Sequence, residues 1–268
     1  MRFLWVGAAF LIACSKETPD ETAPPAEVPV IMPAACGHAH NDYLHARPLL
    51  DAVERGFCSV EVDVFLVQDA LLVAHEIAAT DPTRTLQSLY LDPLRSLRDA
   101  GTIGSSPFLL LIDVKSDAQQ SYAAIDAVLA SYSDLLTVFD GSSISAGDVT
   151  VVISGNRDRP AMEAQSVRYA AMDGRLEDLG TGAAPSLIPL ISESWSYAFL
   201  WQGQGEMPAD ERSRLDGYVK QSHDESRRLR FYAIPDNENT WATLLSAGVD
   251  LINTDNLDGF AAFAATLP

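Results

Sequence analysis

Short apolar runs alternate with longer amphipathic segments along most of this chain, and this alternation limits its fold more than any other feature. The runs are rich in Val, Ile, Leu and Phe and predict eight strands. The predicted strands are the run that ends at 36–40, and residues 59–66, 108–114, 149–154, 168–172, 187–192, 229–234 and 249–253. The predicted helices include residues 47–55, 92–100, 118–132, 209–223, 240–247 and 257–264. Eight strands that alternate with helices over about 235 residues fit a (β/α)8 TIM barrel, an α/β fold whose typical size is about 250 residues.

Polar residues gather where successive predicted strands end. They are His40 and Asn41, Glu61 and Asp63, Asp113 and Lys115, Asn156 and Arg157, Asp173, Ser194 and Trp195, Asp236, and Asn253 and Asp255. In a TIM barrel the carboxyl ends of the strands form the catalytic face. A doubly wound open sheet is the main alternative, but such sheets usually carry a glycine-rich phosphate loop, and no such motif is present in the sequence.

Two carboxylates share one face of the second predicted strand. Glu61 and Asp63 are two residues apart in the run VEVDVF, so both point to the same side, which we expect to be the barrel interior. Their apolar neighbours mean that a cation or an ion pair must hold both charges. Asp113 ends the apolar run LLLID in the same way. Three oxygen ligands favour Mg²⁺ or Ca²⁺ over zinc, and the alternative is that Lys115 or Arg157 neutralises the carboxylates.

The histidines are clustered. Four of the five lie between His38 and His75, and only His223 lies beyond them. His40 ends the first predicted strand, and His75 follows the extended run 70–74. Because imidazoles titrate near neutral pH, two of them on opposite sides of a metal-bound phosphodiester can act as general base and general acid. The alternative is that both are core histidines with satisfied hydrogen bonds.

The overall charge excludes some classes of function. Asp and Glu number 37 against 18 Lys and Arg, a formal net charge of −19 that repels phosphate backbones, so we do not expect nucleic-acid binding. The only long apolar stretch is at the N-terminus, and it is shorter than the roughly 20 residues of a membrane-spanning helix. A polytopic membrane protein is therefore excluded.

The segment HNDYL at 40–44, followed by Glu61, Asp63 and His75, resembles the phosphatidylinositol-specific phospholipase C superfamily. That superfamily also holds the glycerophosphodiester phosphodiesterases and the phospholipases D of the spider-toxin type. The AHNDY opening and the run SGNR at 154–157 are most similar to a bacterial and fungal branch. The resemblance covers the whole predicted barrel, but its specific motifs lie in the first third.

The resemblance implies a role for each matching position. His40 and His75 match the two catalytic histidines. The implied metal ligands are Asn41, Glu61, Asp63 and Asp113, and the implied phosphate-binding residues are Lys115, Asn156 and Arg157. The implied reaction is cleavage of a phosphoric diester with Ca²⁺ or Mg²⁺ as cofactor, in which one histidine removes a hydroxyl proton and the other protonates the leaving alcohol. Glycerophosphodiesters or phospholipid headgroups are the expected substrates.

This chain also departs from the glycerophosphodiesterase pattern, and two other functions stay open. Glycerophosphodiesterases usually follow the first histidine with Arg-Gly and the second with Asp, whereas this chain has Asn41 and Glu76. The run His38-Ala39-His40 also fits an amidohydrolase-type barrel, although no histidine lies between His75 and His223. The other alternative is a non-catalytic, metal-binding envelope lipoprotein. In addition, the loop that follows a late strand places Trp195 as an expected pocket residue.

The N-terminus has the layout of an export signal. Residues 1–14 contain one positive charge and an apolar core, and the tetrad LIAC at 11–14 resembles the lipobox of bacterial lipoproteins. The resemblance implies a lipid on Cys14, then a Pro- and Glu-rich tether at 15–33 and the barrel domain at 34–268. It further implies a lipid-anchored protein of the cell envelope, at the outer membrane of a Gram-negative bacterium or its periplasmic face. The alternatives are an ordinary cleaved signal and a cysteine that falls there by chance.

Several points stay open at this stage. Cys36 and Cys58 either form a disulfide or remain two buried thiols. Asp255 either contacts a headgroup, fixes a loop or caps the last helix. The sequence does not distinguish Ca²⁺ from Mg²⁺, the general acid from the base, or a cyclic from a hydrolysed product. It also leaves the headgroup and the oligomeric state undetermined.

Overall fold

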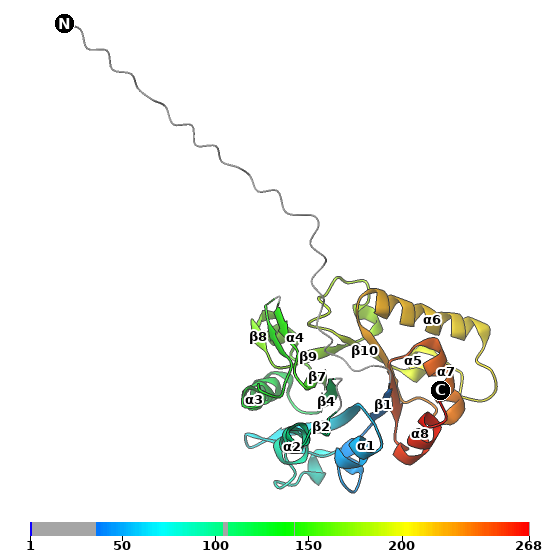
Figure 1. The fold of residues 1–268 in the computed structure, drawn as a ribbon, viewed down its shortest axis with the longest axis horizontal. Coiled ribbons are helices and arrows are strands. Elements are labelled where there is room, and N and C mark those ends of the chain that lie inside the picture. The colour runs from blue at the N-terminus through cyan, green and yellow to red at the C-terminus, as the bar shows by residue number, and fades with distance from the viewer. Residues whose placement is uncertain (2–35, 104–106, 142, 268) are drawn as a thin grey trace.

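Eight parallel strands form a closed barrel in the computed structural model, which describes Met1 and residues 36–103, 107–141 and 143–267 (Figure 1). In ring order they are β1 (Cys36–Ala39), β2 (Ser59–Val67), β4 (Phe108–Val114), β7 (Val149–Gly155), β9 (Ala171–Gly174), β10 (Leu190–Ser194), β11 (Arg228–Tyr232) and β12 (Leu251–Thr254). Strand β1 pairs with β12 on one side and with β2 on the other, which closes the ring. The predicted TIM barrel is confirmed.

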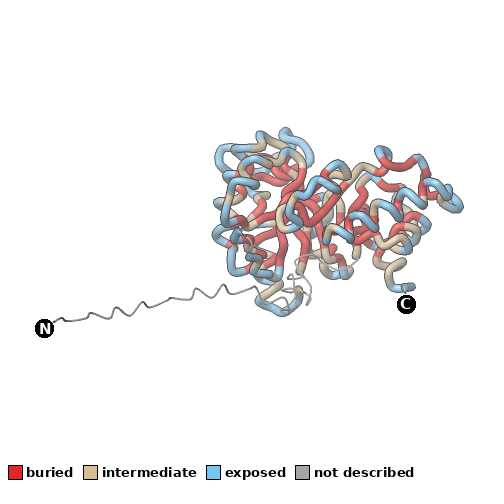
Figure 2. Tube along the Cα trace, turned by 90° about the horizontal axis from the view of Figure 1, so that it is seen from above, coloured by how far each residue is buried: buried red, intermediate tan, exposed pale blue. Residues whose placement is uncertain are grey.

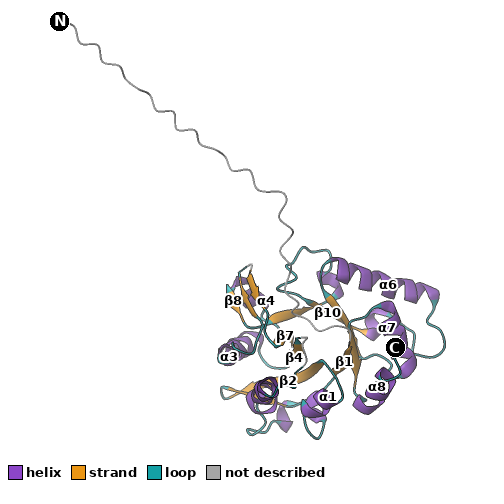
Figure 3. Cartoon of the chain, viewed as in Figure 1, coloured by secondary structure: helices purple, strands orange, loops and turns teal. Residues whose placement is uncertain are grey.

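Helices surround the strands, as Figure 3 shows. They are α1 (Leu50–Glu54), α2 (Asp92–Asp99), α3 (Ala118–Ala130), α4 (Arg159–Ala164), α5 (Trp195–Ala198), α6 (Ala209–Asp224), α7 (Glu238–Ala247) and α8 (Leu257–Ala264). Local chemistry sets several of their ends. The side chain of Asn256 accepts a hydrogen bond from the Gly259 amide at the start of α8, and Gly248 ends α7 with a φ of 90°, in the left-handed region that glycine tolerates best.

Alternate residues along each strand enter two different apolar layers. Val60 and Val62 of β2 belong to the large core between the strands and the helices, and both are fully buried. On β4, Leu109 and Leu111 belong instead to a small cluster inside the barrel, with Leu190 and other residues of the same parity. Figure 2 shows this continuous buried centre with the exposed chain around it. On β4 the inward positions change from Leu109 and Leu111 to Asp113 toward the carboxyl end of the strand.

Smaller elements decorate the barrel. Strand β3 (Ala70–Val73) pairs antiparallel with β2, and β5 (Val138–Asp140), β6 (Ser143–Ser145) and β8 (Val167–Arg168) form a separate three-stranded sheet. Single helical turns occur at η1 (Asp42–Leu44), η2 (Ile77–Ala79) and η4 (Leu176–Asp178), and η3 (Gln87–Leu91) is a π-helical turn before α2.

The structure corrects one predicted strand and settles one open question. The predicted strand 168–172 is wrong in its start, because Arg168 lies in the separate sheet and the barrel strand β9 begins at Ala171. Cys36 and Cys58 form a disulfide, with their Cα atoms 6.1 Å apart. The predicted signal and tether, including Cys14, lie outside the described residues. In the described part of the chain no helix is long and apolar enough to cross a membrane.

Candidate active site

The acidic pair on β2 reaches the barrel interior as the spacing predicts. Ser59, Glu61 and Asp63 alternate along the strand, and the Ser59 hydroxyl lies 2.6 Å from Nδ1 of the buried His38 on β1. Strand β4 pairs in register with β2, so that Asp113 lies beside Asp63. One oxygen from each of Glu61, Asp63 and Asp113 lies within 4.8 Å of the others. We call these three residues the carboxylate cluster.

The chemistry of the carboxylate cluster fits a divalent cation. Glu61 and Asp63 are 5% and 0% exposed, so water does little to screen their mutual repulsion. Asp63 Oδ1 is buried without a hydrogen bond in the described structure, although it lies 3.2 Å from the Lys115 ammonium. A set of closely spaced, partly unsatisfied carboxylate oxygens is the donor set that Mg²⁺ and Ca²⁺ prefer.

Two cationic side chains also contact the carboxylate cluster. Lys115 Nζ lies 2.8 Å from Asp113 Oδ2, and Arg230 of β11 donates to Glu61 Oε2 at 2.9 Å. Burial raises the pKa of Asp113, and Lys115 only partly offsets this effect. Burial also works against the charged form of Glu61, but the Arg230 guanidinium and the nearby histidines hold its pKa well below the usual range. The neutralising role considered for Lys115 is therefore present, shared with an arginine that the sequence analysis did not identify.

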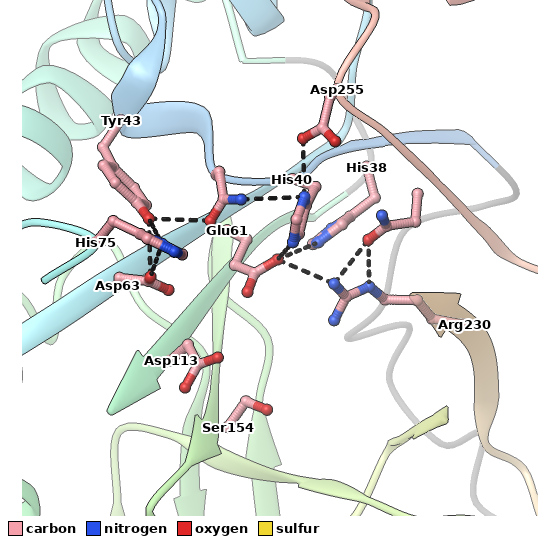
Figure 4. Close-up of polar contacts among 12 residues, drawn as sticks. His38, His40, Tyr43, Glu61, Asp63, His75, Asp113, Ser154, Arg230 and Asp255 are labelled. Carbon is pink, nitrogen blue, oxygen red and sulfur yellow. Dashed lines mark hydrogen bonds and ion pairs between the residues drawn. The ribbon is translucent and has the colours of Figure 1, made fainter. Parts of the chain in front are cut away.

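The two predicted catalytic histidines lie on two sides of Glu61, as Figure 4 shows. His40 Nδ1 lies 2.8 Å from Asp255 Oδ1, and its Nε2 is 3.7 Å from Glu61 Oε2. Burial lowers the pKa of His40, but the hydrogen bond to Asp255 and the charge of Glu61 outweigh burial and raise it. His75 is more open, with 60% of its side chain exposed, and its Nδ1 lies 3.2 Å from Asp63 Oδ2.

Tyr43 joins several of these groups and was missed by sequence reasoning. Its hydroxyl lies 2.7 Å from Asp63 Oδ2, 2.9 Å from Asn41 Oδ1 and 3.0 Å from His75 Nδ1 (Figure 4). Asn41 has a φ of 47°, in the left-handed region that Asn tolerates better than most residues, so the chain turns sharply where β1 ends. The available signal was its place in the HNDYL segment, four residues after the end of β1, and the structure shows that Tyr43 is 3% exposed.

His38 is a supporting residue rather than a candidate for proton transfer. It is fully buried, and burial together with the Arg230 charge lowers its pKa to about 3, so the ring is neutral. Its Nε2 has no hydrogen-bond partner among the described residues and lies 3.7 Å from Glu61 Oε2. The order His38-Ala39-His40 therefore places one histidine inside the barrel and the other at its mouth.

One expectation needs correction, that for Trp195, whereas Asn156 and Arg157 lie apart from the carboxylate cluster. Trp195 is 1% exposed, packs on Phe199 and Phe231 and donates from Nε1 to a backbone carbonyl, so it belongs to the core and not to the pocket. Arg157 donates to the backbone carbonyl of Asp173 on β9, and Asn156 donates to the carbonyl of Ser116 at 2.9 Å. Neither residue contacts the carboxylate cluster in the described structure, because the turn after β7 directs both side chains toward neighbouring backbone.

Asp255 does not cap the last helix. The cap of α8 is Asn256, and Asp255 instead holds His40. The Asp255 side chain is 68% exposed and therefore lies at the rim of the barrel mouth.

Comparison with known proteins defines the class. A family model described as the AIM6-like phosphodiesterase domain matches residues 28–105, and one described as the glycerophosphoryl diester phosphodiesterase family matches residues 228–258. The chain is a phosphoric diester hydrolase built on a TIM barrel. More particularly, it belongs to the family of altered inheritance of mitochondria protein 6.

The relatives in sequence that support this assignment are fungal, and one solved structure is reported beside them. Altered inheritance of mitochondria protein 6 of Eremothecium gossypii is 30% identical over 272 residues, which cover 84% of this chain and 68% of that protein. The homolog from Arthroderma benhamiae is 29% identical and covers 82% of this chain and 81% of its own length. A solved structure, glycerophosphodiester phosphodiesterase from Agrobacterium tumefaciens, covers 86% of this chain and 99% of its own, with 16% identity and a TM-score of 0.49.

The fungal relatives overturn the predicted localisation. The lipobox-like tetrad implied a bacterial envelope lipoprotein, but the curated relatives come from fungi, which have no bacterial outer membrane. A short apolar stretch that ends in a cysteine is too small a pattern to identify a bacterial sorting signal. The predicted placement at a bacterial outer membrane or periplasmic face is therefore wrong, and the lipid anchor is not supported.

Proposed function

We propose that this protein cleaves glycerophosphodiesters or phospholipid headgroups in a cation-dependent reaction, with His40 and His75 as the proton-transfer pair. The observation that carries this proposal is the position of the two imidazoles on two sides of the carboxylate cluster, where one reacting phosphorus atom could lie between them. A general acid and a general base on opposite sides of a scissile bond are what diester cleavage requires.

The proposed cation ligands are Glu61, Asp63 and Asp113, with Asn41 as a further oxygen donor near Asp63. A bound Mg²⁺ or Ca²⁺ would supply Lewis-acid polarisation of the phosphodiester at this position. The Tyr43 hydroxyl hydrogen-bonds to both Asn41 Oδ1 and Asp63 Oδ2, which keeps the Asn41 oxygen near the carboxylate cluster. Tyr43 would thus keep the amide and the carboxylate in fixed relative positions.

Side chains of the protein would carry out proton transfer, orient the histidine and neutralise charge. One histidine removes the proton of the attacking hydroxyl, a new phosphorus–oxygen bond forms, and the other histidine gives its proton to the leaving alcohol as the old bond breaks. Asp255 orients His40 through Nδ1 and leaves Nε2 facing Glu61. Lys115, half-buried beside Asp63 and Asp113, would neutralise charge that develops on the phosphoryl oxygens. Arg157 and Asn156 are further candidates for substrate contact on the β7 side of the mouth.

The charge balance supports an anionic substrate. The carboxylate cluster contributes three negative charges, and Lys115 and Arg230 offset two of them. A divalent cation would leave one net positive charge, which suits a diester with a single negative charge. The match of residues 228–258 to the glycerophosphoryl diester phosphodiesterase family supports glycerophosphodiesters as the first substrates to test.

The test is turnover by the purified protein of bis(p-nitrophenyl) phosphate, glycerophosphocholine, glycerophosphoinositol and phosphatidylinositol, each with Mg²⁺, Ca²⁺ or EDTA. We expect chelator-sensitive cleavage that falls roughly 10²- to 10⁴-fold in His40→Ala and His75→Ala, the usual contribution of a general acid or base. The matched control is His223→Ala, because His223 also pairs with an aspartate, Asp250, at 2.9 Å, but lies on α6. Cleavage that survives EDTA, or that falls equally in the control, would contradict the proposal.

A further inference from the structure

An arginine that no motif of the sequence singled out lies inside the barrel mouth. Arg230 is on β11 and is 3% exposed, so its guanidinium is almost completely withdrawn from water. A buried cation is costly unless it is paired and hydrogen-bonded. Figure 4 shows it directed at Glu61 from the side opposite to Asp63.

Arg230 uses only part of its hydrogen-bonding capacity. Nη2 donates to Glu61 Oε2 at 2.9 Å and to Asn253 Oδ1 at 2.7 Å, and Nε donates to the same Asn253 oxygen at 3.0 Å. In the described structure Nη1 has no hydrogen-bond or ion-pair partner. It is also not among the polar atoms that are sealed from solvent without a partner. Glu61 and Asn253 therefore fix the Nε and Nη2 edge of the guanidinium, and Nη1 keeps its donors unused among the described residues.

The two carboxylate oxygens of Glu61 also differ in their partners. Its Oε2 accepts the hydrogen bond from Arg230 Nη2. The same oxygen lies 3.7 Å from Nε2 of His38 and 3.7 Å from Nε2 of His40. Its Oε1 makes no hydrogen bond within residues 36–103, 107–141 and 143–267. Arg230 therefore occupies one carboxylate oxygen of Glu61 and leaves the other free of hydrogen bonds among the described residues.

We propose that Arg230 contacts the substrate, with Nη1 donating to a non-bridging phosphoryl oxygen while Nη2 holds Glu61. The inference rests on the proposed function, because it assumes a phosphodiester at the carboxylate cluster. A planar guanidinium can bridge a carboxylate and a phosphate with parallel N–H groups, which a lysine cannot do. Arg230 then links the group that positions the cation to the group that receives charge during cleavage.

The alternative is an arginine that only neutralises Glu61. The two roles differ in their effect on the cation. A purely neutralising arginine competes with the cation for Glu61, so its loss should leave turnover intact once enough cation is present. A substrate contact should lower turnover even when the cation site is saturated.

The test compares Arg230→Met and Arg230→Lys with the unmodified protein in three measurements. The first is the affinity for Mn²⁺, measured by calorimetry. The second is turnover of bis(p-nitrophenyl) phosphate at saturating Mn²⁺. The third is the affinity of the Mn²⁺-loaded protein for dimethyl phosphate, an unreactive diester. In Arg230→Met we expect equal or tighter Mn²⁺ binding, a fall in kcat of roughly 10²- to 10³-fold, as for the loss of one preorganised donor, and dimethyl phosphate binding at least tenfold weaker. Millimolar guanidinium should restore part of the turnover.

Arg230→Lys keeps the charge but loses the fork. We expect it to bind Mn²⁺ like the unmodified protein and to turn over more slowly. The matched control is Arg228→Met, which removes an arginine two residues earlier on the same strand, where it pairs with Asp250 at 2.7 Å. Unfolding midpoints of all variants show whether the fold is kept.

The outcomes separate the inference from the proposed function. Unchanged kcat and dimethyl phosphate affinity in folded Arg230→Met would overturn the role of Arg230, even if the protein cleaves diesters. Weaker dimethyl phosphate binding in a protein that cleaves no diester would support the contact while the proposed reaction fails. Turnover that returns fully at high Mn²⁺ would assign Arg230 to neutralisation alone.

Discussion

The disulfide between Cys36 and Cys58 should contribute substantially to the stability of the segment that carries the candidate site. It joins the beginnings of β1 and β2 and closes a loop with a sequence separation of 22 residues. This loop contains His40, Asn41 and Tyr43. Strand β1 pairs with β2 only through His38 and Ala39, so the covalent link reinforces a short part of the barrel closure.

The size of the effect follows from the loop length. In the chain-entropy model, closing a loop of this length removes about 11 cal/mol/K from the unfolded chain, which is about 3 kcal/mol at 25 °C. The assay is urea unfolding with and without a phosphine reductant, on protein in which Cys14→Ala removes the third thiol. The reduced protein should lose about 3 kcal/mol, and a variant that also carries Cys36→Ala and Cys58→Ala should not respond to reductant.

Two results would refute this reasoning. If thiol titration of the unfolded, unreduced protein finds two free cysteines, the bond does not form. If the bond forms but its complete reduction leaves the free energy of unfolding unchanged, the loop is already restricted in the unfolded chain and the entropic argument fails.

Two further predictions test the interior of the protein. Trp195→Ala should lower the free energy of unfolding by about 3–5 kcal/mol, because the indole is buried among aromatic rings. It should leave kcat/KM per folded molecule unchanged, and weaker substrate binding without destabilisation would restore Trp195 as a pocket residue. Burial raises the pKa of Asp42 to about 6 despite hydrogen bonds from the Leu49 amide and the Tyr90 hydroxyl. Because the folded-state pKa lies above the ordinary value of 3.8, this contribution to stability is complete below about pH 4 and is lost as the pH rises through 6. In chelator-treated protein, the stability advantage of Asp42→Asn over the unmodified protein should therefore grow by about 3 kcal/mol from pH 3.5 to 7.5, and an advantage independent of pH would contradict the assignment.

Much of the site could be predicted because it depends on local spacing. Glu61 and Asp63 are two residues apart on a strand, and that period alone places them on one face. Asp113 ends the neighbouring strand, and parallel pairing in register brings it beside them. For the same reason the eight strands were recognisable, since apolar runs and intervening helical periods are properties of contiguous segments.

The missed and misplaced residues depend on contacts between distant segments. Arg230 lies 169 residues from Glu61 in sequence, and the strand RLRFY holds two arginines, so the sequence does not tell which of them is buried or which partner it has. Trp195 follows a strand end just as the candidate catalytic residues do, but the path of the chain after β10 turns it into the core. The N-terminal tetrad misled in another way, because a four-residue pattern carries too little information to fix a cellular location.

By itself, the sequence determined which residues can supply the chemistry: carboxylates and histidines at strand ends, in an order and spacing typical of a barrel phosphodiesterase. Only the tertiary structure decided how they are used. It paired one oxygen of Glu61 with Arg230, placed Asp255 beside His40, and linked Asn41 to Asp63 through the Tyr43 hydroxyl. The physical reason is that strand periodicity is a local property, whereas the balance of buried charge is set by every element that closes around the barrel mouth.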